Sequence, residues 1–377
     1  MKLNHIYKSI ACGVLLAMTA TSCDLDYNPV DTYSDVTEGV NKTDEKPIFN
    51  SVQDVETSMV TLHKKFRDQQ EHWYVDKLLI GDAHSDNAYA GTTGAEVVPY
   101  ETNSIEGSNS VLKRDWDRFL GDIAVANRII VGCDQLKALS ESERGKYQSQ
   151  AKIFRAMVMF DMVRLWGNFP VITTVGGDIT EDNVEEMYPT YFPPQNTAEE
   201  AYAQIEKDLT EAVENPNTPT NDTSDKSILT KSVARAMLAK VYAEKPLRDY
   251  AKVIKYADEL AADGFDLVED FSDLWAYDTE KKDCRVRNTK EAILEAHFPP
   301  GSGNWCTWMF GRNLSNWDES FTWAKWITPS RDLIRLYEEQ GDTKRYNESV
   351  VWYDCGWSNY YPADHYAFMY KCRSAFN

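Results

Sequence analysis

The 377-residue sequence lacks the motifs that mark the commonest classes of enzyme and nucleotide-binding protein. It contains no GxSxG, P-loop, GxGxxG or HExxH pattern and no EF-hand spacing. Its six histidines do not cluster with a serine or cysteine that a base could activate. Because 60 residues are acidic, pairs of carboxylates arise by chance, and a glycosidase-type pair carries little information. The sequence therefore offers no motif for a catalytic site or for a cofactor site.

Positive charge is scarce. The chain has 40 lysines and arginines against 60 acidic residues, a formal net charge of −20. A surface of this charge is repelled by the phosphates of nucleic acids and by anionic lipid headgroups. The sequence therefore argues against nucleic-acid binding and against membrane adhesion through a basic patch.

The seven cysteines lack the spacing of a metal site or of a disulfide framework, because no CxxC pair occurs. Cys12 and Cys23 fall in the first 23 residues. The remaining five are Cys133, Cys284, Cys306, Cys355 and Cys372. An odd number allows at most two bridges, and free buried thiols fit equally well.

Long apolar runs are missing beyond the N-terminus, so no later segment reaches the eighteen residues of a membrane-spanning helix. Lys2 and Lys8 precede an apolar run over residues 10–20, which has the length of a signal-peptide core. Small residues then lead to Cys23, as in the lipobox of bacterial lipoproteins, although Ala20 is smaller than usual. We expect residues 1–22 to be removed and Cys23 to be lipidated. The alternative is an ordinary secretory signal, and both predict export.

Hydrophobic periodicity predicts a mostly α-helical protein. Residues 23–50 form an extended tether with no helical period, and residues 51–266 form a helical scaffold. Ser51 and Thr197 are predicted N-caps, and Ser140 begins a third helix that continues to residue 166. Expected helices begin at residue 51 and cover 110–136, 140–166, 197–213, 233–244 and 250–262. Residues 81–107 are rich in glycine and polar residues and are expected to be a long loop.

Small residues alternate with large ones on the helices over 233–244 and 250–262. Ala239 and Tyr242 precede the turn between them, and Tyr256 and Ala257 follow it. This spacing favours stacked helix pairs of the tetratricopeptide (TPR) type, an α-α superhelix. An ordinary antiparallel helix pair is the simpler alternative.

Residues 267–377 are predicted to be a loop-rich region in which tryptophans concentrate. Residues 291–298 fit a short strand or helix, and residues 329–339 fit a helix. Exposed indole rings stack on the apolar faces of sugars, while neighbouring polar groups bind the hydroxyls. The candidate ligand residues on the expected loops are Trp305, Trp308, Trp317 and Trp323, with Tyr100 and Arg312 as second choices. The alternative for each tryptophan is burial in the core.

A polar cluster contains Asp82, His84, Asp86 and Asn87. Its spacing matches no metal-binding motif, so we interpret it as turn chemistry at the end of a helix.

Five segments, in order, resemble the SusD/RagB-like family of outer-membrane lipoproteins of the Bacteroidetes. The most specific one is AKIFRAMVMFDMVRLWGNFPV over residues 151–171. The others lie at 197–212, 229–242, 288–298 and 328–345. The resemblance implies a lipid-anchored, surface-exposed protein with a TPR-like scaffold that works in nutrient uptake, as in starch or polysaccharide utilisation. It would capture oligosaccharides, or peptides or glycopeptides as in some relatives, and deliver them to a SusC-like TonB-dependent transporter. The resemblance thus implies a binding protein that is not an enzyme, and we expect no cofactor.

One block of the family is absent. Relatives continue with a helical segment beyond the counterpart of Lys371, so we expect the family's C-terminal part to be missing here. Two other functions remain open at this stage. A TPR scaffold would bind a partner protein through the helical surface over residues 110–262, and a surface glycoside hydrolase would need an acid–base pair that no motif identifies.

Overall fold

Helices dominate the computed structural model, which describes residues 47–91, 94–177, 179, 181, 183–302, 304–311, 325–353 and 366–375. The predicted signal, Cys23 and most of the predicted tether lie outside the described residues. From Ile48 onwards the chain forms one structural unit. None of the helices in the described ranges combines the length and apolarity needed to cross a membrane. The boundary between residues 266 and 267 stays a prediction.

The long helices begin at the capping residues expected from the sequence. Ser51, Ser140 and Thr197 each accept a hydrogen bond from the backbone three residues on, and an acidic residue completes a capping box at each site. Gly167 ends the helix that Ser140 begins, and its φ of 71° favours glycine. The helices of the scaffold are α3 (Val52–Asp68), α6 (Ser110–Gln135), α7 (Glu141–Trp166), α9 (Ala198–Glu214), α10 (Lys231–Ala243) and α11 (Tyr250–Ala262).

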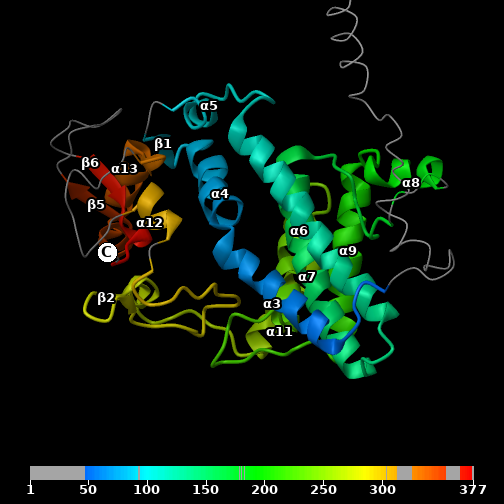
Figure 1. The fold of residues 1–377 in the computed structure, drawn as a ribbon. Helices are drawn as coiled ribbons and strands as arrows, with labels where there is room; N and C mark the ends of the chain where they lie inside the picture. The colour runs from blue at the N-terminus through cyan, green and yellow to red at the C-terminus, as the bar shows by residue number, and fades with distance from the viewer. Residues whose placement is uncertain are drawn as a thin grey trace, which may run out of the picture. The chain divides into compact units, whose positions relative to one another are not determined.

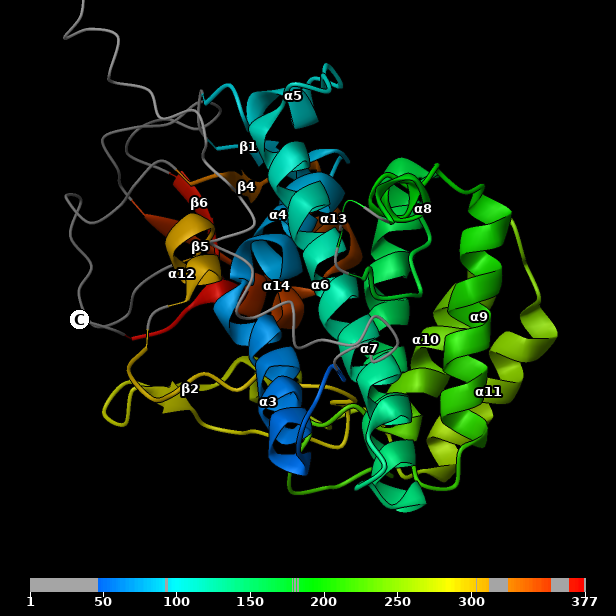
Figure 2. The same cartoon turned by 45° about the vertical axis from the view of Figure 1, so that its right-hand side comes forward.

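These helices pack mostly against their neighbours in sequence (Figure 2). Helix α7 lies between α6 and α9, and α10 lies between α9 and α11. The main hydrophobic core runs through this stack, and most of the second half of α7 is buried. Tyr242 and Tyr256 stack with ring centroids 6.1 Å apart, at the predicted contact between α10 and α11. The prediction of a mostly helical, TPR-like fold is confirmed.

A buried ion pair joins α7 to α9. The guanidinium of Arg155 donates to both carboxylate oxygens of Asp208 at 2.8 and 2.7 Å, and its third hydrogen bond, of 2.7 Å, goes to Asn127 on α6. Arg155 and Asp208 are 4% and 1% exposed. A pair with this bidentate geometry offsets the cost of removing both charges from water. It fixes how three helices of the stack sit together.

The expectation of a long loop over residues 81–107 is only partly correct, because short regular elements interrupt the turns and irregular chain of this segment. Helix α3 is followed by the π-helical turn η1 (Glu71–Val75), helix α4 (Asp76–Leu78) and a second π-helical turn, η2 (Leu79–Ala83). Strand β1 (Ala88–Ala90) and helix α5 (Val98–Glu101) come next. Strand β1 pairs antiparallel with β4 (Ile327–Pro329), and Tyr89 lies opposite Thr328. A partner more than 230 residues away orders this segment, and local composition carries no sign of it.

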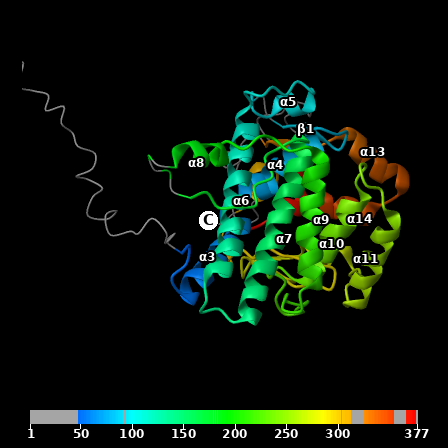
Figure 3. The ribbon, with the colours of Figure 1, turned by 90° about the vertical axis from the view of Figure 1, so that its right-hand side faces the viewer.

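Short elements make up the rest of the described chain (Figure 1). Helix α8 (Val184–Tyr191) stands at the edge of the stack and buries none of its residues (Figure 3). Residues 291–298 form neither a strand nor a helix, contrary to expectation, and α13 (Arg331–Gln340) begins after its cap Ser330, two residues later than predicted. The remaining elements are η3 (Phe271–Trp275), β2 (Tyr277–Asp278), β3 (Asp283–Cys284), α12 (Trp305–Met309), α14 (Thr343–Ser349), β5 (Val350–Tyr353), β6 (Tyr366–Met369) and η5 (Tyr370–Cys372).

Candidate functional site

Two of the predicted ligand residues, Trp305 and Trp308, lie together on the short helix α12. The sequence predicted a loop here, and the structure corrects that prediction. Asn304 acts as the N-cap, because its Oδ1 accepts hydrogen bonds from the backbone N–H of Thr307 at 2.9 Å and from its hydroxyl at 3.2 Å. This cap fixes the helix start despite the glycine-rich sequence before it.

Trp305, at 39% exposed, is the most accessible tryptophan among the described residues, since the others are buried or half-buried. Its backbone N–H donates to Oε1 of Gln70 at 2.8 Å, so α12 is tied to the start of η1. Trp308, one turn further along, is half-buried. The indole of Trp305 therefore offers an apolar surface held by a fixed backbone, which is what stacking on a planar ligand requires.

The C-terminal end of α12 is firmly anchored. The carbonyl of Trp308 accepts from Nζ of Lys325 at 2.8 Å, and the carbonyl of Met309 accepts from the backbone N–H of Trp326 at 2.9 Å. Gly311 lies against the backbone of Cys372, and an added Cβ would stand 1.8 Å from the carbonyl oxygen of that residue. Burial lowers the pKa of Lys325 to about 8. These contacts hold α12, the helix that carries the indole of Trp305, in a fixed position.

The thiols of Cys306 and Cys372, on and near α12, are unreactive. Burial raises the pKa of Cys306, and it raises the pKa of Cys372 to about 12. Both cysteines pack against a hydrophobic cluster formed by Val97, Tyr100, Phe310 and their neighbours. A thiol with a raised pKa stays protonated and is a poor nucleophile at neutral pH. The two cysteines act here as small apolar side chains.

The other predicted ligand residues are placed differently. Tyr100 requires a correction: its ring is fully buried in the cluster beneath α12, and its hydroxyl donates to Asn109 at 3.3 Å. Burial also raises its pKa. A ring with no accessible face cannot stack on a ligand, so we remove Tyr100 from the candidates. Trp317, Trp323 and Arg312 lie outside the described residues.

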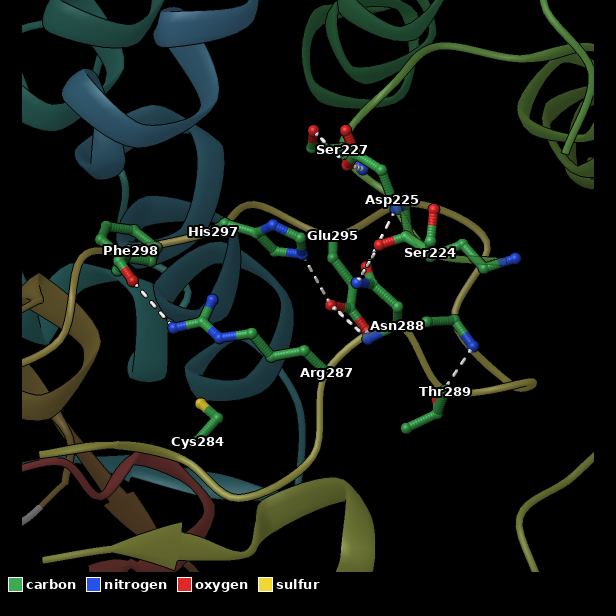
Figure 4. A network of polar contacts seen from close by, with 12 residues as sticks. Ser224, Asp225, Ser227, Cys284, Arg287, Asn288, Thr289, Glu295, His297 and Phe298 are labelled. Atoms are coloured by element: carbon green, nitrogen blue, oxygen red, sulfur yellow. Dashed lines mark hydrogen bonds and ion pairs between the residues drawn. The ribbon is translucent and has the colours of Figure 1, made fainter. Parts of the chain in front are cut away.

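A polar clamp holds the irregular segment that leads to α12 (Figure 4). Asn288 has a φ of 55°; its side chain accepts from the backbone N–H of Lys226 at 2.9 Å and donates to the carbonyl of Ser224 at 2.6 Å. The backbone N–H of Asn288 donates to the carboxylate of Glu295 at 3.0 Å, and His297 contacts the same carboxylate at 3.0 Å. The clamp therefore fastens the segment over 288–298 to the loop that precedes α10.

Gln70, Asn304 and Lys325 shape the site but were not singled out in the sequence. Asn304 could have been recognised as an N-cap. Gln70 and Lys325 carry no such signal, because each acts on α12 from a distant part of the chain. The predicted turn at Asp82 is confirmed, since the backbone N–H and hydroxyl of Ser85 both donate to the Asp82 carbonyl.

Comparison with known families gives a match over residues 32–243, more than half of the chain, to a SusD-like family described as "Starch-binding associating with outer membrane". A "SusD-like protein" of Bacteroides ovatus is 25% identical over 309 residues. That alignment covers 78% of this chain and 50% of the relative, so the chain spans about half the length of the curated relative it matches.

Solved structures share the fold. A "Laminarin binding SusD-like protein" superposes with a TM-score of 0.66 at 19% identity, covering 87% of this chain and 73% of that one. "Surface glycan-binding protein A" from Bacteroides fluxus gives 0.65 at 20% identity over 86% and 69% of the two chains. The protein of that title from Bacteroides thetaiotaomicron, in complex with laminarihexaose, gives 0.63 at 14% identity over 86% and 71%.

Proposed function

The chain belongs to the SusD-like family, and from that premise we propose that it binds oligosaccharides at the cell surface. The observation that carries the proposal is the exposed indole of Trp305 on the anchored helix α12. A neutral sugar ring presents C–H groups on its face and hydroxyls at its rim. An accessible aromatic ring with polar neighbours such as Asn304 and Gln70 matches both.

Binding without catalysis is part of the proposal. The thiols beside α12 have raised pKa values, and Lys325 is buried with its ammonium directed at backbone carbonyls. These groups hold α12 in place and do not face solvent as an acid, a base or a nucleophile would. A surface glycoside hydrolase would act through a pair of carboxylic acids, and no motif in the sequence identifies such a pair, so it is the less favoured function.

Attachment and delivery complete the proposed role. The family description places its members at the outer membrane. We propose that Cys23 carries the lipid anchor, that residues 24–50 act as the tether, and that a SusC-like TonB-dependent transporter receives the captured oligosaccharide. The predicted lipobox before Cys23 supports the anchor, and the family resemblance supports the transporter.

Isothermal titration of the purified chain against a panel of neutral oligosaccharides tests the proposal. Laminarihexaose belongs in the panel because a structural relative is solved with it. We expect at least one oligosaccharide to bind, with no release of reducing sugar during the titration. Absence of binding across the panel would contradict glycan capture, and release of reducing sugar would support the hydrolase instead.

A protein-binding scaffold is the second candidate, and one surface favours it. On α11, Tyr250 and Ile254 lie one helical turn apart and are 59% and 62% exposed. Exposed apolar residues at this spacing are typical of surfaces that receive a helix or peptide. Peptides and glycopeptides in the same titration distinguish the two functions, because the scaffold predicts peptide binding without glycan binding.

A further inference from the structure

Two carboxyl groups meet in the interior between the π-helical segment and α6. Asp76 forms part of α4, between η1 and η2, and is 0% exposed, while Asp115 lies on α6 and is 1% exposed. Nη2 of Arg114 donates to Oδ2 of Asp76 at 2.5 Å. The same guanidinium reaches Asp115 only through Nε, at 3.9 Å, which is too long for a hydrogen bond.

Both acids keep an oxygen without a hydrogen-bond partner in the part of the chain that the structure describes. Oδ1 of Asp76 and Oδ1 of Asp115 are fully shielded from solvent and accept no hydrogen bond. Buried carboxylate oxygens of this kind are costly unless a donor reaches them. The two carboxyl groups lie on either side of one guanidinium, that of Arg114, and two ionised carboxylates have no hydrogen atom to share.

The charges around the two acids leave one negative charge unmatched. Asp76, Asp115 and Glu71 provide three carboxyl groups, while Arg114 and Arg118 provide two guanidinium groups. Arg118 forms an ion pair with Glu71, in which Nη1 and Oε2 are 2.8 Å apart. Tyr100 faces the same interior but is neutral, and its hydroxyl donates to Asn109. The group is neutral when one of the three acids is protonated.

From this geometry we propose that Asp76 and Asp115 form a proton-binding site, in which one proton held on Asp115 bridges the two side chains. The proton makes Asp115 the donor to Asp76, so it supplies the missing partner for both unpaired carboxyl groups. Asp76 keeps its ion pair with Arg114. The bridge fastens the π-helical segment to α6, and that segment begins beside Gln70, which holds the backbone of Trp305.

The proton makes stability depend on pH in a defined direction. Burial, followed by the charge of Asp76, raises the pKa of Asp115 from 3.8 to about 9. Between these two values the folded chain holds one proton that the unfolded chain has released. The contribution of this site to stability is therefore greatest at the acidic end of this window and is lost as pH rises through the raised pKa of Asp115.

Replacement of Asp115 by asparagine tests the proposal, because an amide can donate to Asp76 without binding a proton. Unfolding by urea is measured for the wild type and Asp115→Asn at pH 5, 6, 7 and 8. We expect the ratio of their unfolding equilibrium constants to change about tenfold per pH unit, in favour of the variant as pH rises. Parallel curves for the two proteins would overturn the proposal.

Asp208→Asn is the matched control. Asp208 is equally buried, but both its oxygens are bound by Arg155, so its replacement removes no shared proton. We expect this variant to be less stable at every pH, with an unchanged pH slope relative to the wild type. A slope change in Asp208→Asn equal to that in Asp115→Asn would also overturn the proposal.

Infrared spectroscopy decides the matter if Asp115→Asn does not fold. The carbonyl stretch of a protonated carboxylic acid is measured at pH 7 in Asp82→Asn, because burial raises the pKa of Asp82 as well and would add a signal. We expect a protonated carboxyl band at pH 7 that disappears near pH 9. Its absence at pH 7 would overturn the proposal.

Discussion

At the scale of single residues, three of the motifs that carry the family resemblance contain residues that hold the scaffold together. Arg155 belongs to the segment 151–171, and Asp208 belongs to the segment 197–212, which the structure joins in one bidentate ion pair. Asn288 begins a third motif, and its left-handed backbone and two side-chain hydrogen bonds account for an asparagine there. These motifs therefore report on the scaffold and not on the ligand.

Loss of one partner of the buried pair has a large expected cost. In Asp208→Asn, the guanidinium of Arg155 stays buried without its counter-charge, and we expect the free energy of unfolding to fall by about 3–5 kcal/mol. Urea denaturation at pH 7 measures the change. Asp332→Asn is the control, because Asp332 forms an exposed pair with Arg335. We expect the control to lose less than about 1 kcal/mol. Equal losses in both variants would show that the Arg155–Asp208 pair contributes no more than an exposed ion pair.

Two candidate ligand residues, Trp305 and Tyr100, look alike in the sequence but differ in the structure. Trp305 and Tyr100 were both candidates because each stands among polar, glycine-rich residues. The structure exposes Trp305 and buries Tyr100 completely. Their difference arises from β1 pairing with β4 and from α12 folding over the cluster that contains Tyr100. Such long-range contacts leave no mark on the neighbouring sequence.

At the scale of elements, the long helices could be predicted because their signals are local. The capping boxes at Ser51, Ser140 and Thr197 lie within four residues of the helix starts that they define. The three-residue strands have no comparable signal, since their hydrogen-bond partners are distant. Helix α12 has a local cap in Asn304, but its position depends on the distant Gln70. The scaffold was therefore predictable and the region around α12 was not.

Helices α8 and α9 are expected to differ sharply in their tolerance of substitution. Tyr188 on α8 is 55% exposed, so Tyr188→Ser removes little buried surface. We expect its effect on the free energy of unfolding to stay within about 0.5 kcal/mol. Ile205 on α9 is fully buried, and Ile205→Ala is expected to cost about 2–5 kcal/mol. Chemical denaturation of both variants provides the comparison, and a cost above 2 kcal/mol for Tyr188→Ser would mean that α8 is packed against something.

The polar clamp is expected to hold its segment through Asn288. Asn288→Ala removes two side-chain hydrogen bonds and places a residue that disfavours positive φ at this position. We expect a loss of about 2–3 kcal/mol, with faster hydrogen exchange over residues 288–298.

Asn288→Gly separates the two contributions to the clamp, because glycine accepts the backbone angle but makes no side-chain bond. We expect it to recover about 1 kcal/mol of the loss. Unchanged exchange over residues 288–298 in both variants would show that the clamp does not hold the segment.

At the scale of the whole molecule, the excess of acidic residues is expected to oppose folding. A formal net charge of −20 creates self-repulsion that salt screens, since the Debye length falls from about 30 Å at 0.01 M to about 8 Å at 0.15 M. We expect the melting temperature at pH 7 to rise by about 2–4 °C over this range. Differential scanning calorimetry with sodium chloride measures the rise. A fall would mean that screening of favourable ion pairs outweighs relief of repulsion.

The proposed function depends on how the scaffold supports the region around α12. The helical stack supports a small, loop-connected region in which α12 presents Trp305, and the family match and the structural relatives connect this fold with glycan-binding proteins. The central claim is therefore that the Trp305 face of α12 binds the oligosaccharide.

Isothermal titration of Trp305→Ala with the best ligand of the panel tests this claim most directly. Phe192→Ala is the matched control, because Phe192 is the C-cap of α8 and is 66% exposed. Helix α8 lies away from α12, on the other side of the helical stack (Figure 1). We predict that Trp305→Ala lowers the affinity at least about tenfold, or about 1.4 kcal/mol, while Phe192→Ala leaves it unchanged. Unaltered affinity in a folded Trp305→Ala protein would contradict the account.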